Sequence, residues 1–253
     1  MQPGGDRPDG RSGARTTWGL WGLTLATGAV AGGVFLAVPE IDLSAARAFY
    51  GADVGFVGER LAWVHALRQA FVGLYVGTIA LCLVGLAQIW RGRLQWLQLG
   101  KAQWLFLAAC LAAGPGLVAN LVFKDHWGRA RPSQIAEFGG SKAFTPPLLV
   151  ARQCKRNCSF ISGEAASTYV TLYAAAAVVP QWSGALIVAG TVGGLATGLV
   201  RMAQGGHFLS DVVFAGVFMA LTVLALRRLM LRGGLSPGSR PEAPAREAPG
   251  PPP

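Results

Sequence analysis

Six apolar runs of membrane-spanning length constrain the fold of this chain more than any other feature of its sequence. A helix needs about 20 predominantly apolar residues to cross the hydrocarbon core of a bilayer. Runs of about that length cover Trp18–Val38, Ala70–Trp90, Ala102–Phe123, Ser162–Val179, Trp182–Val200 and Ser210–Leu229. Only 13% of the 253 residues are charged, against about 25% in a soluble domain. The sequence therefore predicts an all-α, polytopic membrane protein with six transmembrane helices over residues 17–232.

The basic residues divide into two groups, and their placement argues against nucleic acid as the partner despite a net charge of +10. One group flanks the first, second, third and sixth runs on what becomes a single side of the membrane: Arg7, Arg11, Arg15, Arg91, Arg93, Lys101, Arg227, Arg228 and Arg232. The positive-inside rule makes that side cytoplasmic. The second group lies on the opposite side: Lys124, Arg129, Arg131, Lys142, Arg152, Lys155, Arg156 and Arg201. Cations placed against the rule indicate an anionic ligand, with contact to lipid headgroups as the alternative.

The terminal segments and the cysteines allow four further expectations. Residues 1–16 and the Pro-, Gly- and Ala-rich residues 233–253 are expected to be disordered cytoplasmic segments. The first run exceeds the about 7–15 residues of a secretory signal, so we expect a retained anchor. Cys154 and Cys158 lie in the loop opposite the cytoplasm, where a disulfide is expected if that side is oxidising, and free thiols otherwise. Two cysteines are too few for a structural zinc site.

A cluster of cations follows the third run. Lys124 to Pro132 reads K-x6-R-P. If the helix continues, Lys124 and Arg131 lie two turns apart on one side, and Pro132 ends the helix. An ammonium and a planar guanidinium together suit the oxygens of a phosphate. The alternative is a pair of side chains that extend to the headgroups at a helix end.

The fourth run begins with Ser162, Gly163 and Glu164. Serine is a preferred N-cap residue, and the free amides of a first helical turn form an anion site. Plain capping is the alternative. A carboxylate at the start of a membrane helix is costly without a role or a partner, although the helix N-terminus itself favours an anion.

The last motif lies between the fifth and sixth runs. Arg201, His207 and Asp211 form the pattern R-x5-H-x3-D. A carboxylate bonded to one nitrogen of an imidazole fixes its tautomer and leaves the other nitrogen free to attack an electrophile. Because His207 and Asp211 are four residues apart, they share one face of a helix. A polar histidine satisfied by a neighbouring aspartate is the alternative.

Six alternating spans place all three motifs on one face of the membrane. The segment Glu40–Arg68 lies on the same side, where we expect a helix along the interface. Its residues give no indication of function, and His65 is expected to be incidental.

On these residues the chain resembles the type 2 phosphatidic acid phosphatase superfamily, whose motifs are K-x6-R-P, P-S-G-H and S-R-x5-H-x3-D. The first motif is complete in Lys124, Arg131 and Pro132. The second differs at Ile161 and Glu164, and the third has Val200 in place of serine. The segments Phe138-Gly-Gly and Asn157-Cys-Ser-Phe look most like bacterial envelope phosphatases that act on lipid A or isoprenoid phosphates.

The resemblance implies a reaction through a phosphohistidine, without a metal or other cofactor. His207 would be the nucleophile and Asp211 its orienting base, while Glu164 would take the proton-donating role of the usual histidine. The phosphoryl oxygens would be held by Lys124, Arg131, Arg201 and the backbone at Ser162 and Gly163.

The expected function is hydrolysis of a lipid phosphate monoester or diphosphate. The lipid would be of the lipid A, isoprenoid or glycerolipid type. The enzyme would lie in the bacterial inner membrane with its active site facing the periplasm. The alternatives are a phosphotransferase that uses the same histidine and a catalytically degenerate lipid-binding protein.

Overall fold

A computed structural model describes residues 10–93 and 95–231 as an all-α membrane protein. Seven α-helices form its frame in the described residues: α1 Gly10–Ala37, α2 Glu40–Arg47, α3 Ala62–Trp90, α4 Lys101–Leu111, α5 Gly163–Val178, α6 Ser183–Ala203 and α7 Leu209–Met230. A π-helical segment, η2 Ala112–Lys124, continues α4. Short 3-10 turns lie at η1 Val57–Glu59, η3 Pro132–Gln134, η4 Ala136–Phe138 and η5 Pro180–Trp182. Two small hairpins pair β1 Tyr50–Gly51 with β2 Gly55–Phe56 and β3 Gln95–Trp96 with β4 Leu99–Gly100.

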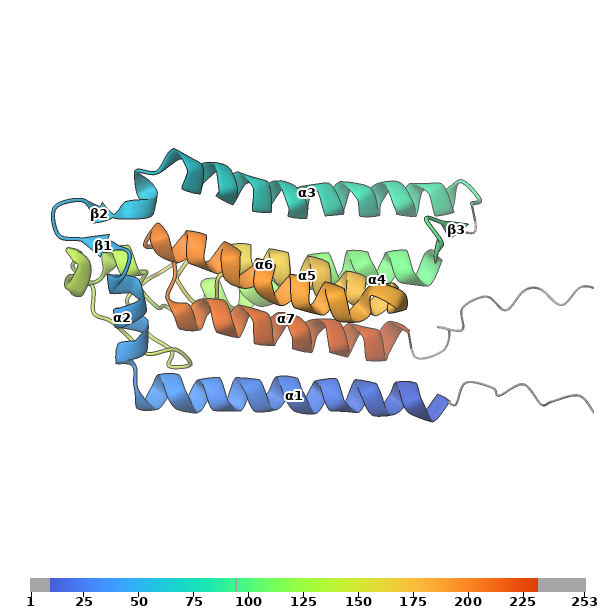
Figure 1. Cartoon of the computed structure of the whole chain (residues 1–253), viewed down its shortest axis with the longest axis horizontal. Coiled ribbons are helices and arrows are strands. Elements are labelled where there is room, and N and C mark those ends of the chain that lie inside the picture. The colour runs from blue at the N-terminus through green and yellow to red at the C-terminus, as the bar shows by residue number, and fades with distance from the viewer. Residues whose placement is uncertain (1–9, 94, 232–253) are drawn as a thin grey trace, which may run out of the picture.

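The long helices lie side by side in an elongated bundle with α5 at its centre (Figure 1). Helix α5 contacts α3, α4, η2, α6 and α7. Small residues allow this close packing. A Cβ atom at Gly194 of α6 would overlap the ring of Tyr169 on α5, so glycine is required where these two helices meet.

The predicted spans agree closely with the helices, but the number six is not confirmed. Within residues 10–93 and 95–231, five helical segments are long and apolar enough to cross a membrane: Gly19–Ala37, Ala62–Trp90, Lys101–Lys124, Pro180–Ala203 and Leu209–Met230. Helix α5 matches the fourth predicted run, Ser162–Val179, but has only 16 residues, a length of about 24 Å at 1.5 Å per residue. It lies inside the bundle, where the other helices separate it from lipid.

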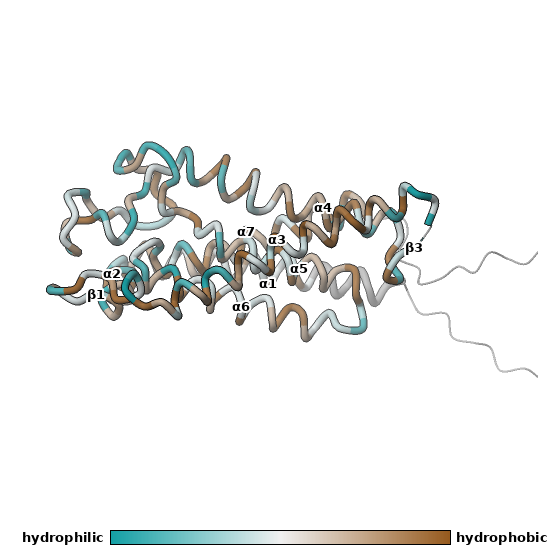
Figure 2. The backbone as a smooth tube through the Cα atoms, turned by 90° about the horizontal axis from the view of Figure 1, so that it is seen from above, coloured by the Kyte–Doolittle hydropathy of each residue, from teal (hydrophilic) through white to brown (hydrophobic). Residues whose placement is uncertain are grey.

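The outer helices expose apolar side chains, which is the expected pattern for surfaces that face lipid. Such residues include Leu23 and Val30 on α1, Val76 and Leu83 on α3, and Val188 on α6. Hydrophilic residues gather at the two ends of the bundle (Figure 2). The bundle therefore has the polarity of a multi-pass membrane protein.

The helix that carries Lys124 ends there, so the prediction that it continues to Arg131 is wrong. Gly128 has φ +69°, and a Cβ atom at this position would overlap the carbonyl of Ala151. Only glycine accepts this turn without strain. Arg131 follows in an extended conformation, with φ −81° and ψ 157°, immediately before η3.

The segment Glu40–Arg68 also differs from the single interfacial helix that we expected. It forms α2, the β1–β2 hairpin, η1 and the first turns of α3, which begins at Ala62 and not at Ala70. Figure 1 shows α2 running across one end of the bundle, beside the loops that carry the motifs. The segment thereby brings its own polar side chains to that end.

Candidate active site

The motif residues converge at one end of the bundle, as the alternating spans predict. Glu164 at the start of α5 lies 3.6 Å from Arg201 Nε near the end of α6. His207, in the loop before α7, contacts the carbonyl of Ser159. A Cβ atom at Gly163 would lie 2.8 Å from the ammonium nitrogen of Lys124, so the lysine head lies against the first turn of α5.

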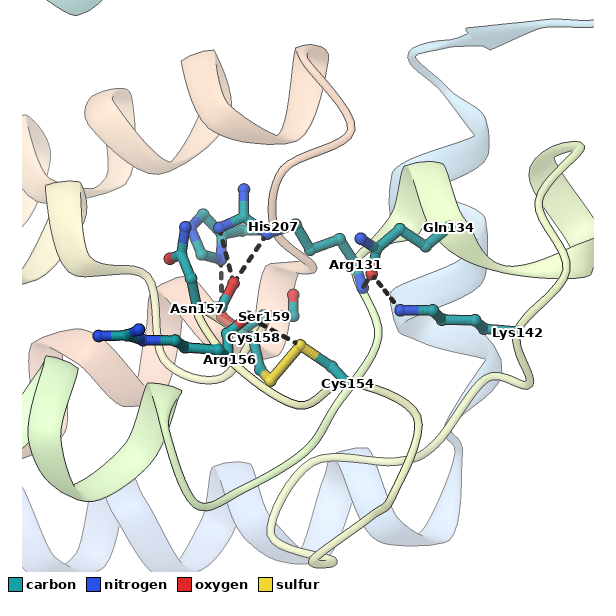
Figure 3. Close-up of a disulfide and its surroundings, with 9 residues drawn as sticks. All are labelled: Arg131, Gln134, Lys142, Cys154, Arg156, Asn157, Cys158, Ser159 and His207. Atoms are coloured by element: carbon teal, nitrogen blue, oxygen red, sulfur yellow. Dashed lines mark hydrogen bonds between the residues drawn. A yellow bond between two sulfur atoms is a disulfide. The ribbon is translucent and has the colours of Figure 1, made fainter.

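His207 is held in one tautomer. Its Nδ1 atom lies 2.7 Å from the carbonyl oxygen of Ser159 (Figure 3). A carbonyl oxygen only accepts hydrogen bonds, so Nδ1 carries the proton and Nε2 has the free lone pair. Burial lowers the pKa of His207 to about 4, and the nearby positive charges of Lys124 and Arg131 act in the same direction. The imidazole is therefore neutral at neutral pH, with Nε2 available as a nucleophile.

Asp211 positions the segments on both sides of His207 but makes no hydrogen bond to its imidazole ring. Its Oδ2 atom lies 3.7 Å from His207 Nδ1, which is beyond hydrogen-bond distance. The carboxylate accepts hydrogen bonds from Ser159 Oγ at 2.5 Å and from the Phe208 amide at 2.8 Å. It also accepts one from Arg129 Nη1 at 2.5 Å. Asp211 thus fixes both segments that position the imidazole, and its direct bond to the ring, expected from the spacing, is absent from the structure.

Arg129 and Asp42 form a buried ion pair that the sequence analysis did not identify. Arg129 Nη2 lies 2.7 Å from Asp42 Oδ2, and both side chains are fully buried. Asp42 also accepts hydrogen bonds from the amide of Ser210 at 2.8 Å and from its hydroxyl at 2.5 Å. The Arg129 guanidinium lies 4.3 Å from the centre of the Phe208 ring. This network joins α2 to the start of α7. Arg129 could have been singled out because it lies inside the first motif, whereas no sequence pattern points to Asp42.

Glu164 is enclosed by two arginines. Arg68, on α3, donates to both carboxylate oxygens, from Nε at 3.0 and 3.1 Å and from Nη2 at 2.7 Å. Arg201 Nε lies 3.6 Å from the same group. Two neighbouring positive charges favour the ionised carboxylate, which has no proton to give. The role of proton donor expected for Glu164 therefore does not fit this geometry.

Two buried donors among the predicted site residues make no hydrogen bond to any described residue. They are Ser162 Oγ and Arg201 Nε. Ser162 occupies the N-cap position of α5, but its side chain makes no capping bond. A buried polar atom without a partner is costly. The two atoms, the Lys124 ammonium and the amides of α5 thus form a set of donors suited to an oxyanion.

His65 is linked to Arg201 and is not incidental. The Gln204 amide nitrogen lies 3.2 Å from His65 Nδ1, and His65 Nε2 lies 3.0 Å from the carbonyl of Glu59. The Gln204 side-chain oxygen accepts a hydrogen bond from Arg201 Nη1. Because the Glu59 carbonyl only accepts, His65 carries its proton on Nε2 and accepts from Gln204 at Nδ1. A chain of hydrogen bonds thus orients the Arg201 guanidinium.

A disulfide joins Cys154 to Cys158 in the loop between η2 and α5 (Figure 3). The backbone of Asn157, inside this loop, accepts hydrogen bonds from Arg131 Nη2 at 2.9 Å and Nε at 3.3 Å. Ser159 follows directly and contacts His207. The loop therefore connects the positions of Arg131 and His207. Burial lowers the pKa of the Arg131 guanidinium from its ordinary value.

The chain is similar in sequence to proteins of one phosphatase family. A model of the PAP2 superfamily, the type 2 phosphatidic acid phosphatases, matches residues 103–233. A lipid A 4'-phosphatase of Francisella tularensis subsp. novicida is 36% identical over 78% of this chain and 90% of its own length. The lipid A 4'-phosphatase of Rhizobium leguminosarum is 34% identical over 76% of this chain and 88% of its own. One from Rhizobium etli is 38% identical over 46% of this chain and 44% of its own. No solved structure matches the chain significantly.

Proposed function

The chain belongs to the PAP2 superfamily of phosphatases, and we propose that it removes the 4'-phosphate of lipid A. Two relatives that this chain matches along most of their length carry that name. The membrane bundle supports an amphiphilic substrate, because a lipid can present its headgroup to the polar end while its chains stay in the bilayer.

The observation that carries the proposal is the neutral His207 beside two buried donors that make no hydrogen bond, Ser162 Oγ and Arg201 Nε. Nδ1 is occupied by the Ser159 carbonyl, so Nε2 attacks the phosphorus atom. The phosphoryl oxygens accept hydrogen bonds from Ser162 Oγ and Arg201 Nε, and Lys124, Arg131 and the amides at Gly163 add positive charge. Donors placed where negative charge develops stabilise the transition state.

Catalysis then proceeds in two steps. The bond from Nε2 to phosphorus forms as the ester bond breaks, and the electron pair departs with the sugar oxygen. That oxygen takes a proton from water. The resulting hydroxide attacks the phosphohistidine, the N–P bond breaks, its electron pair returns to Nε2, and hydrogen phosphate leaves. Asp211 keeps the imidazole in place through Ser159 and Phe208, and no metal takes part.

The charge distribution supports an active site on the outer face of the inner membrane. Arg91, Lys101 and Arg227 lie at the opposite end of the bundle from the motifs. Under the positive-inside rule that end is cytoplasmic, so the site faces the periplasm.

The test uses the full chain in detergent with lipid A, a glycerolipid phosphate and an isoprenoid phosphate, in the presence of a chelator. We expect release of free phosphate from lipid A, and trapping in alkali of protein labelled with phosphate on His207. His207→Ala should abolish both signals. His126→Ala is the matched control, because His126 is an exposed histidine near the same end of the bundle.

Three results would contradict parts of this proposal. Phosphate found on a second lipid, with none released, would favour the phosphotransferase. Full activity in His207→Ala would exclude the phosphohistidine. Loss of activity with the chelator, restored by added metal, would exclude the metal-free reaction.

A further inference from the structure

Arg68 is a cation at the candidate site that lies outside all three motifs and outside the residues matched by the superfamily model. It belongs to the first turns of α3, 96 positions from its partner Glu164. The two side chains are connected by three hydrogen bonds. Glu164 stands where the superfamily has the histidine that the resemblance makes the proton donor. Glu164, the residue that departs from the superfamily motif, is therefore paired with Arg68, a cation from outside the motifs.

The ion pair leaves one nitrogen of the Arg68 guanidinium without a hydrogen bond to Glu164. Its hydrogen bonds to Glu164 use Nε and Nη2, so Nη1 is the guanidinium nitrogen that they leave over. The Arg68 side chain is 34% exposed, whereas His207 is 2% exposed. Arg68 thus lies at the open side of the site and the nucleophile at its buried side.

An in-line displacement places the leaving oxygen on the side of phosphorus away from the nucleophile. With His207 buried, that side is the open one, where the lipid must also extend. Arg68 is held there by Glu164, whose Oε1 atom also lies 3.6 Å from Arg201 Nε. The electrostatic influence of Arg68 on Arg131 and Arg201 agrees with this closeness.

We propose that Arg68, held by Glu164, donates a hydrogen bond to the leaving oxygen of the lipid phosphate and replaces the proton donor of the superfamily motif. The inference rests on the proposed phosphatase function. As the ester bond breaks, its electron pair moves to the leaving oxygen, and the Nη1–H group stabilises the negative charge. Arg68 keeps its proton, and the alkoxide takes one from water, which reaches this open side. The hydroxide formed then hydrolyses the phosphohistidine.

The role in leaving-group departure can be separated from phosphate binding with a matched pair of amphiphilic phosphates. Both carry the same alkyl chain, but one is an alkyl ester and the other a nitrophenyl ester whose phenolate leaves without help. For Arg68→Ala in the full chain, we expect kcat/KM to fall about a hundredfold on the alkyl ester and less than threefold, roughly, on the nitrophenyl ester. Inhibition by inorganic phosphate should be unchanged, because that ligand has no leaving group.

Two further variants keep the test decisive if Arg68→Ala folds poorly. Arg68→Lys retains the charge, and Glu164→Gln weakens the hold on Arg68, so each should give a smaller loss with the same preference for the nitrophenyl ester. Arg60→Ala is the control, because Arg60 is an exposed arginine at the same end of the bundle, and it should match the wild type on both esters.

Equal losses on the two esters, or weaker inhibition by phosphate in Arg68→Ala, would overturn the inference and make Arg68 a phosphoryl-binding or structural residue. These results would leave the phosphatase function intact. If the wild-type protein hydrolysed neither the esters nor lipid A, the proposed function itself would fail, and this inference with it.

Discussion

The imidazole of His207 donates from Nδ1 to the carbonyl oxygen of Ser159 at 2.7 Å. The two residues are 48 positions apart, and the contact joins the loop before α7 to the loop before α5. It decides which ring nitrogen is free for chemistry.

The first prediction concerns the protonation of His207. With histidines labelled with 15N, NMR should show the Nδ1–H tautomer and a titration near the pKa of about 4. The chain has only three histidines, so His207→Ala assigns the signal. A titration near the ordinary value of 6.5, or a proton on Nε2, would contradict the assigned nucleophile.

The lowered pKa of His207 also predicts how the free energy of unfolding changes with pH. Because the pKa in the folded state is lower than in the unfolded state, the unfolded chain binds more protons between about pH 4 and 6.5. The contribution of His207 to the free energy of unfolding is therefore complete above pH 6.5 and declines as the pH falls through that window. Thermal unfolding of the wild type and of His207→Ala should converge as the pH decreases.

The second prediction concerns Asp211. Asp211→Asn removes the negative charge that is paired with the buried Arg129. It also places an NH2 group, itself a donor, against groups that donate hydrogen bonds to the carboxylate. Breaking a buried ion pair costs about 3 to 5 kcal/mol, so thermal unfolding in detergent should occur at clearly lower temperature and turnover should fall. Asp53→Asn changes an exposed carboxylate at the same end and should change neither. An unchanged melting temperature in Asp211→Asn would show that the network contributes little to stability.

The third prediction concerns Gly163. In Gly163→Ala the new methyl group would lie 2.8 Å from Lys124 Nζ. The end of a lysine side chain can move away cheaply, so we expect nearly normal stability. The displaced ammonium should lower kcat about a hundredfold, the effect of a small misplacement at a reacting centre. Gly184→Ala, where a Cβ atom meets nothing within 4 Å, is the control. Normal turnover in Gly163→Ala would contradict a role of Lys124 in the reaction.

The fourth prediction concerns the chain from His65 through Gln204 to Arg201. Gln204→Ala and His65→Ala should each lower kcat/KM about tenfold, the equivalent of one hydrogen bond to a charged group. Because both act through the same guanidinium, the double variant should be little worse than Gln204→Ala alone. Losses that multiply in the double variant would show that the two residues act independently.

The positions of the helices could be predicted from the sequence because membrane insertion depends on local composition. Apolar runs predicted the bounds of α5 and α7 to within a residue or so, and the alternation of spans predicted that Lys124, Arg201 and His207 meet at one end. The start of α3 could not be predicted in the same way, because the charge of Arg68 interrupts the apolar run. An ion pair with Glu164 allows a helix to carry that charge.

The sequence by itself determined the class of protein, the order of its spans and the motifs that identify its superfamily, because hydropathy and spacing are properties of neighbouring residues. Only the tertiary structure decided the partners of the polar groups: Arg68 for Glu164, Asp42 for Arg129, and the Ser159 carbonyl for His207. Each of these contacts joins residues at least 48 positions apart. Such pairs depend on how the helices pack, and no local pattern in the chain encodes the distance between two side chains on different helices.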